Sequence, residues 1–326
     1  IDTKKALRSV GVQAIITGDF LSVLGGSLIE DRPPIAIDKV RHFGEVVAVV
    51  VANSEKEAAK AIKLIDVKYE PLPVVNSIQD ALNPNTQLIH EKLGEYNCIV
   101  KDVHPQAGTN IADHIKIRKG DISTGWTESD ITVESSFVLP QSDHLAMETR
   151  NTIVEILPDG NVIINTSSQA PFSIQEKLSK LYKIPEGNVI VNVPLVGGAF
   201  GGKATIQTEY IAYLASKAVG GRKVKVLNTR EEDITSAPCK IGVEAKLKLS
   251  ATKDGMLKAL ECIYWVDCGA YSDTGPHMAK ALAVDCTGPY NIPNVHCDAF
   301  TVYTNHNYVT SFRGYGHSAF TFCIER

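Results

Sequence analysis

The glycine-rich stretch from Val196 to Lys203 constrains this chain more than any other feature of its sequence. It reads VGGAFGGK, so half of its residues are glycines. Glycine has no Cβ, which permits positive φ angles and lets the backbone approach a ligand closely. A predicted strand at 189–193 precedes the stretch, and a helical pattern at 206–218 follows it. Such a strand–loop–helix connection presents backbone N–H groups, which suit an anionic or oxo-bearing ligand.

The loop also has other readings. Gly197 to Lys203 satisfies the phosphate-binding pattern GxxxxGK, but the next residue is Ala204, so the Ser or Thr hydroxyl that binds Mg²⁺ is missing. No second motif ending in an acidic Mg²⁺ ligand is evident, so a nucleotide hydrolase is disfavoured. The spacing is not the GxGxxG of dinucleotide-binding loops either. A tight turn whose glycines serve packing alone stays open at this point.

Composition places the chain among ordinary globular proteins. It has 326 residues, of which 44% are hydrophobic and 21% charged, and this length suggests about two domains. The net charge of −4 provides no basic field for nucleic acid or for an anionic membrane surface. No apolar run approaches the roughly 18 residues of a membrane-spanning helix. We therefore expect no nucleic-acid partner and no membrane association.

The seven cysteines are widely spaced and include no CxxC pair, so neither a zinc site nor a thioredoxin-type motif is expected. Most of them lie in apolar sequence contexts, where free thiols serve as small buried side chains. This usage fits a reducing cytoplasm, which is the localisation that we expect. The seven are Cys98, Cys239, Cys262, Cys268, Cys286, Cys297 and Cys323.

The first part of the chain reads as a small unit of mixed secondary structure. The continuous apolar run at 45–51 predicts a buried strand. Ser54, followed three residues later by Glu57, predicts a capping box at the start of a helix. Residues 67–70 predict a returning strand. A strand–helix–strand unit is therefore expected over 45–70.

The rest of the chain alternates between helical and extended patterns. A short helix is expected at 77–82, and residues 85–118 show no clear periodicity, which is typical of a linker. A turn within 152–165 predicts a β-hairpin. A helical pattern between two extended segments predicts a crossover unit over 161–193. Alternating apolar residues around another turn predict long paired strands within 243–263. The expected fold class is α+β.

Two further segments place polar side chains where they could serve a site. Thr166–Gln169 lies at the end of a predicted strand, just before a helix. Phe312–Gly316 arranges a planar cation and an aromatic ring around two glycines. Taken singly, the first reads more simply as a capping segment and the second as a turn with a surface arginine. Together with the glycine loop, they weaken the interpretation that the glycines serve packing alone.

These three segments resemble the cofactor motifs of the molybdenum hydroxylases, the large subunits of xanthine dehydrogenases and aldehyde oxidases. Phe43–Val50 and Tyr69–Pro73 are similar to the α/β hammerhead domain of that family. Lys119–Asp121, His144–Glu148 and Gly288–Asn294 are similar to the start of its molybdopterin-binding domain. The order and spacing of the segments make the resemblance specific, and it covers nearly the whole chain.

The resemblance implies a domain order and a fold. Residues 1–84 would form an α/β hammerhead domain that is truncated at its N-terminus. Residues 85–118 would link it to the first part of the molybdopterin-binding domain at 119–326.

The resemblance also implies a cofactor, a molybdenum ion held by molybdopterin in its plain or cytosine dinucleotide form. Gln169 would be the catalytic residue of this chain, donating a hydrogen bond to an oxo ligand of the metal. Gly198, Phe200 and Gly201 would bind the cofactor with it, the last two through backbone N–H groups beside the metal. Arg313 would lie near the pterin. No protein side chain need ligate the metal, so no metal ligand is assigned.

The family oxidises a C–H carbon of a small-molecule substrate with water as the oxygen source, and electrons leave through 2Fe–2S clusters to FAD. The resemblance therefore implies a xanthine dehydrogenase-like enzyme acting on a purine or another N-heterocycle. Its implied partners are an iron–sulfur subunit, an FAD subunit and the remaining part of the large subunit. Two alternatives stay open. One is aldehyde oxidation, and the other is a non-catalytic paralogue that serves as a binding or assembly module.

Two positions are assigned to the substrate. Tyr315 occupies the place of an aromatic residue that packs on the substrate ring in the family. Purine-specific members carry a glutamate just after the loop lysine and an arginine before the FRG-type motif. This chain has Ala204 and Ala281 at those places, with Lys280 next to the latter as a possible replacement cation. The departure puts xanthine itself in doubt.

The general base of the family is a glutamate near the C-terminus of the large subunit, which we expect to lie beyond Arg326. Glu148, Glu209 and Glu325 occupy no matching motif. Glu148 is instead expected to pair with a backbone group or an arginine. The chain is therefore expected to be a fragment, or one piece of a split subunit, and to be inactive alone.

Overall fold

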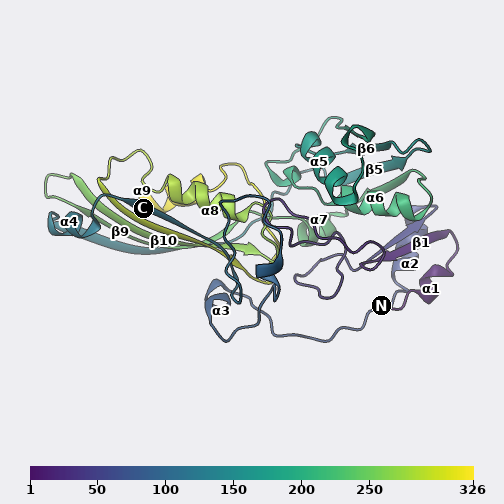
Figure 1. The fold of residues 1–326 in the computed structure, drawn as a ribbon, viewed down its shortest axis with the longest axis horizontal. Coiled ribbons are helices and arrows are strands. Elements are labelled where there is room, and N and C mark those ends of the chain that lie inside the picture. The colour runs from purple at the N-terminus through teal and green to yellow at the C-terminus, as the bar shows by residue number, and fades with distance from the viewer. The chain divides into compact units, whose positions relative to one another are not determined.

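The computed structural model describes residues 1 to 326, which divide into two compact units (Figure 1). Unit 1 comprises Ile1–Gly25, Arg32–Pro73 and Leu145–Ala237. Unit 2 comprises Gly26–Asp31, Val74–His144 and Pro238–Arg326. Each unit has its own hydrophobic core.

Unit 1 is built around helix α6. Its four-stranded sheet has the order β7-β6-β5-β8, in which only β6 and β7 are parallel. Helix α6 contacts β5 and β8 of this sheet and also the antiparallel pair β1–β2, and its residues 208–216 are all buried. The elements are α1 (Lys4–Leu7), β1 (Val12–Thr17), β2 (Ala48–Ala52), α2 (Glu55–Ile62), β5 (Asn151–Ile156), β6 (Val162–Thr166), α5 (Pro171–Tyr182), η2 (Glu186–Asn188), β7 (Val189–Asn192), η3 (Gly202–Ala204), α6 (Thr208–Ala218), β8 (Val224–Leu227) and α7 (Arg230–Ser236).

Most local predictions for unit 1 are confirmed. The hairpin is β5–β6, with Ile156 opposite Val162. The crossover unit is β6–α5–β7, and α5 begins at Pro171, whose fixed φ suits the first helical position. Ser54 caps α2, because its Oγ accepts a hydrogen bond from the N–H of Glu57.

Two expectations for the N-terminal segment are wrong. The strand predicted at 45–51 begins only at Ala48, and Val51 alone in it is fully buried, because β2 pairs with a single neighbour, β1. No strand forms at 67–70. In that region Asp66 makes one isolated bridge to Asp2, so the partner of β2 precedes it in the chain instead of following it.

Unit 2 is a five-stranded sheet of order β3-β11-β10-β9-β4, in which only β10 and β11 are parallel. Helix α8 packs on β3, β10 and β11, and α9 contacts both α8 and β9 (Figure 1). The long hairpin β9–β10 confirms the paired strands expected within 243–263. The elements are α3 (Ile78–Leu82), η1 (Leu93–Glu95), β3 (Ile111–Lys119), α4 (Ile122–Thr127), β4 (Ile131–Leu139), β9 (Gly242–Ala251), β10 (Leu257–Gly269), α8 (Gly275–Val284), β11 (Asn294–Tyr303) and α9 (His317–Glu325).

The interval 85–118, to which the sequence assigned no regular element, contains most of strand β3. Its residues 111–119 pair with β11 along the edge of the sheet. This strand alternates charged and apolar residues and is only partly buried, which weakened its signal. The short helix expected at 77–82 is confirmed as α3, with Ser77 as its N-cap.

A buried carboxylate in unit 2 holds a histidine. Oδ2 of Asp267 lies 2.6 Å from Nδ1 of His306, and Nε2 of that ring lies 3.1 Å from Oδ1 of Asn76. The hydrogen bond to Asp267 raises the pKa of His306 above its ordinary value of 6.5, although partial burial opposes the shift. Both ring nitrogens face oxygen atoms, so the geometry favours the imidazolium form.

Candidate functional site

The glycine loop and Gln169 leave the same edge of the unit 1 sheet. Strands β6 and β7 are parallel and in register, with Asn165 opposite Asn192. Gln169 follows the carboxyl end of β6, and the loop at 196–203 follows the carboxyl end of β7. In open parallel α/β sheets, ligands bind outside the carboxyl ends of the strands, and the pair β6–β7 repeats that local arrangement. The fold therefore brings together two of the three segments that the sequence analysis selected.

The loop backbone is arranged to expose N–H groups. Gly198, Phe200 and Gly201 have φ values of 95°, 54° and 103°, so three of the four successive residues at 198–201 lie in the positive-φ region. No protein acceptor is found for the N–H groups of Gly198, Ala199 and Phe200. Successive amides without a protein acceptor are suited to an anionic or oxygen-bearing group. The loop does not run directly into α6, since η3 and residues 205–207 intervene.

Gln169 has a fixed amide orientation. Its Oε1 accepts a hydrogen bond of 3.0 Å from the N–H of Gly201, and the side chain is otherwise exposed. Because the N–H of Gly201 must face an oxygen, this bond distinguishes Oε1 from Nε2 of Gln169. Nε2 is then directed away from the N–H of Gly201. The structure shows no protein partner for Nε2. Of the two amides expected to face the cofactor, that of Gly201 is therefore bonded to Gln169, whereas that of Phe200 has no partner.

The lysine of the loop is paired inside the protein. Nζ of Lys203, whose side chain is only 3% exposed, lies 2.8 Å from Oε2 of Glu148. The same carboxylate oxygen accepts the N–H of Gly197, at 2.8 Å, and Oε1 accepts from Asn151. Burial alone raises the pKa of Glu148, but the hydrogen bonds from Lys203 and Gly197 outweigh it and lower the pKa. A lysine held in this way does not reach out to a phosphate, and this agrees with rejection of the nucleotide-binding reading.

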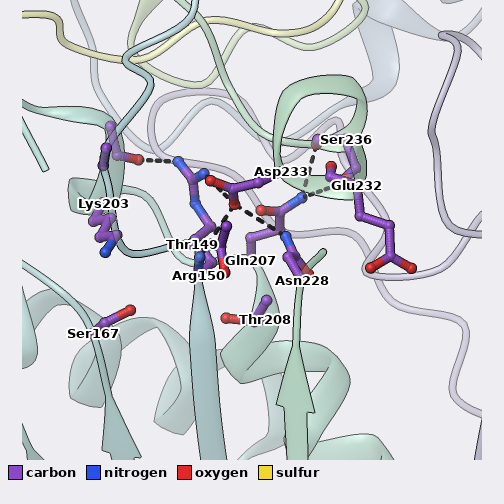
Figure 2. A network of polar contacts seen from close by, with 12 residues as sticks. Thr149, Arg150, Ser167, Lys203, Gln207, Thr208, Asn228, Glu232, Asp233 and Ser236 are labelled. Atoms are coloured by element: carbon purple, nitrogen blue, oxygen red, sulfur yellow. Dashed lines mark hydrogen bonds and ion pairs between the residues drawn. The ribbon is translucent and has the colours of Figure 1, made fainter. Parts of the chain in front are cut away.

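A buried ion pair, drawn in Figure 2, is hydrogen-bonded to the backbone of the loop. Nη1 of Arg150 lies 3.0 Å from Oδ1 of Asp233, and the two side chains are 8% and 6% exposed. Oδ1 of Asp233 also accepts the N–H of Arg150 and the amide of Asn228. Nη2 of Arg150 donates to the carbonyl of Gly202. The guanidinium therefore ties the loop to α7, whose own start is fixed by a capping box.

Glu209 belongs to the supporting structure. Its Oε2 accepts the N–H of Gln207, at 3.0 Å, and its Oε1 accepts the hydroxyl of Thr166, at 2.6 Å. Thr152 links Thr166 to Thr208 through hydroxyl contacts of 2.9 and 2.8 Å. These bonds join the end of β6 to the first turn of α6, and they account for a carboxylate that is 5% exposed.

The third segment selected from the sequence lies in unit 2. Phe312 stacks on His144 with ring centroids 4.7 Å apart, and His144 Nε2 lies 2.8 Å from the carbonyl oxygen of Ser311. The N–H of Tyr315 closes a tight turn to the carbonyl of Phe312, at 2.6 Å. This turn leaves the side chain of Arg313 exposed.

Left-handed non-glycine residues mark the same segments. Such residues are uncommon, and they concentrate at functional sites because surrounding structure must hold them there. The chain has five, of which Phe200 and Tyr315 fall within two of the three selected segments, and Leu145 falls within His144–Glu148, another segment that carries the resemblance. The other two are Lys183, which ends α5, and Asp273.

Two further residues discussed at the sequence level have structural partners. Nζ of Lys280 lies 2.6 Å from Oδ2 of Asp102, so its charge is already neutralised in part. The carboxylate of Glu325 accepts the hydroxyl of Tyr290. Ala204 lies in η3 and is half-buried. Glu148 pairs with a backbone group as expected, but its cation is Lys203 and not an arginine.

Arg150 and Asp233 were not predicted from the sequence, in which they lie 83 positions apart. No local pattern connects them. The sole signal was the charged run at the start of α7, which a capping box explains equally well.

None of the helices combines the length and the apolar character that crossing a membrane requires.

Comparison with known proteins gives the site a context. Residues 103–326 match the model of the molybdopterin cofactor-binding domain, and residues 1–73 match that of the aldehyde oxidase and xanthine dehydrogenase a/b hammerhead domain. This domain order confirms the expected fold class.

The relatives extend over the whole chain. It is 33% identical, over 99% of its length, to a probable xanthine dehydrogenase subunit of Bacillus subtilis (strain 168). It is 29% identical, over its full length, to the nicotinate dehydrogenase large molybdopterin subunit of Eubacterium barkeri. Among solved structures, the aldehyde oxidoreductase of Desulfovibrio gigas superposes with a TM-score of 0.86 at 27% identity over 97% of the chain.

The chain spans 41% of the Bacillus protein, 73% of the Eubacterium protein and 34% of the Desulfovibrio chain. Each family model occupies the part of the sequence in which the resemblance was found, and the larger one covers more than half of the chain. The chain belongs to the molybdopterin-binding large-subunit family of the xanthine dehydrogenases and aldehyde oxidases.

Proposed function

We propose that this chain forms part of the catalytic subunit of a molybdenum hydroxylase that oxidises a C–H carbon of an N-heterocycle, with water as the oxygen source. One observation carries the proposal. The unpaired N–H groups of Gly198, Ala199 and Phe200 lie in the loop that also fixes the amide of Gln169. A donor-rich cradle without a metal-ligating side chain fits a cofactor that brings its own metal ligands and offers oxygen atoms to the protein.

The residues of unit 1 would act by binding and orientation. When bound, the molybdenum–molybdopterin cofactor supplies the two-electron oxidation. Phe200 N–H and Gln169 Nε2 would donate hydrogen bonds to its oxygen atoms, and Gly198 would allow close approach of the backbone. Because Gly201 holds Gln169 in place, the amide donor is preorganised and needs no rearrangement during the reaction. Arg150 and Glu148 would keep the loop in this form through Gly202 and Gly197.

The residues of unit 2 would serve the pterin and the substrate. Arg313 is exposed and carries a planar cation suited to an oxygen- and nitrogen-rich ring system. Tyr315 presents an aromatic side chain on a left-handed turn. The relatives named for xanthine and nicotinate both act, by their names, on N-heterocycles, and this supports that substrate class.

Aldehyde oxidation is the second candidate. Ala204 follows the loop lysine where a purine-binding glutamate is expected, and Lys280 is paired with Asp102. These features leave the positions associated with purine recognition without a free charged group. The likeness to an aldehyde oxidoreductase favours the same reading. Turnover of nicotinate, hypoxanthine and benzaldehyde by the full-length enzyme separates the two candidates.

The complete enzyme would need further components. We propose that 2Fe–2S clusters and FAD on partner subunits or domains accept the electrons, and that the rest of the large subunit supplies the general base. Extraction and chromatography of the cofactor would distinguish plain molybdopterin from its cytosine dinucleotide form.

Gln169 provides the sharpest test of the proposed site. Gln169→Glu keeps an oxygen for the N–H of Gly201 but removes the Nε2 donor, whereas Gln169→Ala removes both. We expect both variants of the full-length enzyme to lose about 100-fold in kcat at unchanged molybdenum content, by analogy with the loss of one preorganised donor. Gln13→Ala, at an exposed position, is the matched control. Retention of kcat by the Glu variant would overturn the donor role.

A further inference from the structure

Three cysteines that are far apart in the sequence meet in the core of unit 2. Cys262 lies on β10 directly opposite Cys297 on the parallel strand β11, and Cys286 follows the end of α8. Their sulfur atoms all lie within 4.8 Å of one another. Each residue is at most 1% exposed, and none forms a disulfide.

The three thiols lie close enough to share one ion. Their sulfur atoms come from β10, from β11 and from the segment after α8, and all lie within 4.8 Å of one another. Metals bind the thiolate form of cysteine, so an ion bound here would displace protons from these buried thiols.

A polar group without a hydrogen-bond partner lies on the same strand as Cys262. Tyr264 lies two residues beyond Cys262 on β10, so its side chain projects from the same face of the sheet. It is fully buried, and its hydroxyl has no hydrogen-bond partner. A buried hydroxyl without a partner is costly, and a metal-bound thiolate nearby would accept a hydrogen bond from it.

The donor set selects the kind of metal. Three sulfurs around one ion at bonds of about 2.3 Å lie about 4.0 Å apart if the arrangement is planar, which requires a small contraction of this cluster. Soft thiolates favour Cu(I) or Zn²⁺, but structural Zn²⁺ takes four ligands. The cluster contains no fourth cysteine, histidine or carboxylate. A three-coordinate soft ion therefore fits better than zinc.

A cavity lies beside the segment that carries Cys286. Asp285 and Gly288, on either side of Cys286 in the chain, line this cavity of about 290 Å³ together with Phe320 and Ile324. Asp285 supplies a carboxylate at its wall, whereas Cys286 itself is buried.

We propose that Cys262, Cys286 and Cys297 form a three-sulfur site for one Cu(I) ion in the core of unit 2. Each thiol that binds as a thiolate releases one proton, and no electron is transferred. With two thiolates and one thiol, the site carries a net charge of −1, which the hydroxyl of Tyr264 is available to stabilise by donating a hydrogen bond. The site pins α8 to strands β10 and β11 and is independent of the proposed molybdenum chemistry.

The test uses the full-length protein, kept anaerobic and reduced, with Cu(I) delivered from its bicinchoninate complex. We expect one Cu(I) per chain, and an X-ray absorption spectrum with three sulfur neighbours at about 2.3 Å. Cys286→Ala should weaken binding at least 100-fold. Cys268→Ala is the matched control, because Cys268 is equally buried on the same strand but lies outside the cluster.

Several results overturn the proposal. These are nitrogen or oxygen neighbours in the wild-type spectrum, equal binding by the Cys286 and Cys268 variants, and failure of the protein to compete with bicinchoninate. Cys297→Ala provides a second ligand deletion if the first variant fails to fold. The wild-type spectrum decides the ligand set without any substitution.

Discussion

The buried pair Arg150–Asp233 makes a strong prediction about stability. Asp233→Asn keeps the shape of the side chain but removes its charge, and the guanidinium of Arg150, 8% exposed, is left without an anionic partner. Removing one member of a buried ion pair costs about 3–5 kcal/mol, because the remaining charge is uncompensated. Asparagine can still accept a hydrogen bond, so we expect the lower end, about 3 kcal/mol. For a domain of this size, that corresponds to a fall in Tm of roughly 10 °C.

Scanning calorimetry and molybdenum analysis of the full-length protein check this prediction together. Because Arg150 also holds the carbonyl of Gly202, the variant should lose bound cofactor as well as stability. Asp80→Asn, at an exposed position, should change stability by less than about 0.5 kcal/mol. Joint replacement by Arg150→Met and Asp233→Leu should restore most of the stability. A cost below about 1 kcal/mol for Asp233→Asn would refute the reasoning.

Three further predictions concern the loop and the titrating groups. Gly201→Val should abolish cofactor loading, since valine does not tolerate a φ of 103°, whereas Gly187→Val, which enters open space, should load normally; molybdenum content measures both. Glu148→Gln should lower the free energy of urea unfolding at pH 7 by about 2 kcal/mol, because Lys203 loses its charged partner. The pKa of Glu148 is lowered in the folded state, so the wild type should be more stable than Glu148→Gln above the ordinary pKa of 4.5. This difference in free energy of unfolding should vanish as pH falls through the folded pKa. A difference that does not depend on pH would contradict the prediction. The pKa of His306 is raised in the folded state, so its stabilising contribution is complete below pH 6.5 and should be lost as pH rises through the folded pKa. His306→Gln should remove this dependence of the free energy of unfolding on pH.

Features that depend on neighbouring residues could be predicted from the sequence. The turn between β5 and β6, the helix starting at Pro171 and the hairpin β9–β10 are each encoded within a short window by turn residues and periodicity. The glycine loop could also be found, because positive φ angles require glycine at positions such as Gly201. These segments could therefore be identified from the sequence alone, without knowing which of them are in contact.

Features that depend on distant residues could not be predicted. The partner of Arg150 lies on α7, and the three cysteines lie on β10, on β11 and after α8, so no spacing rule applies. The strand expected at 67–70 does not form, and Tyr69 is 59% exposed there, because β1 pairs with β2 from the other side in sequence. In each case tertiary structure, and not local preference, decides which groups meet.

The central claim is that the loop at 196–203 and Gln169 hold a molybdenum cofactor. Metal and pterin analysis tests this most directly, on the full-length protein produced in a host that makes molybdopterin. The account predicts one molybdenum and one pterin per chain, and their loss in Gly201→Val while the protein stays folded. A folded wild-type protein that contains neither molybdenum nor pterin would contradict it.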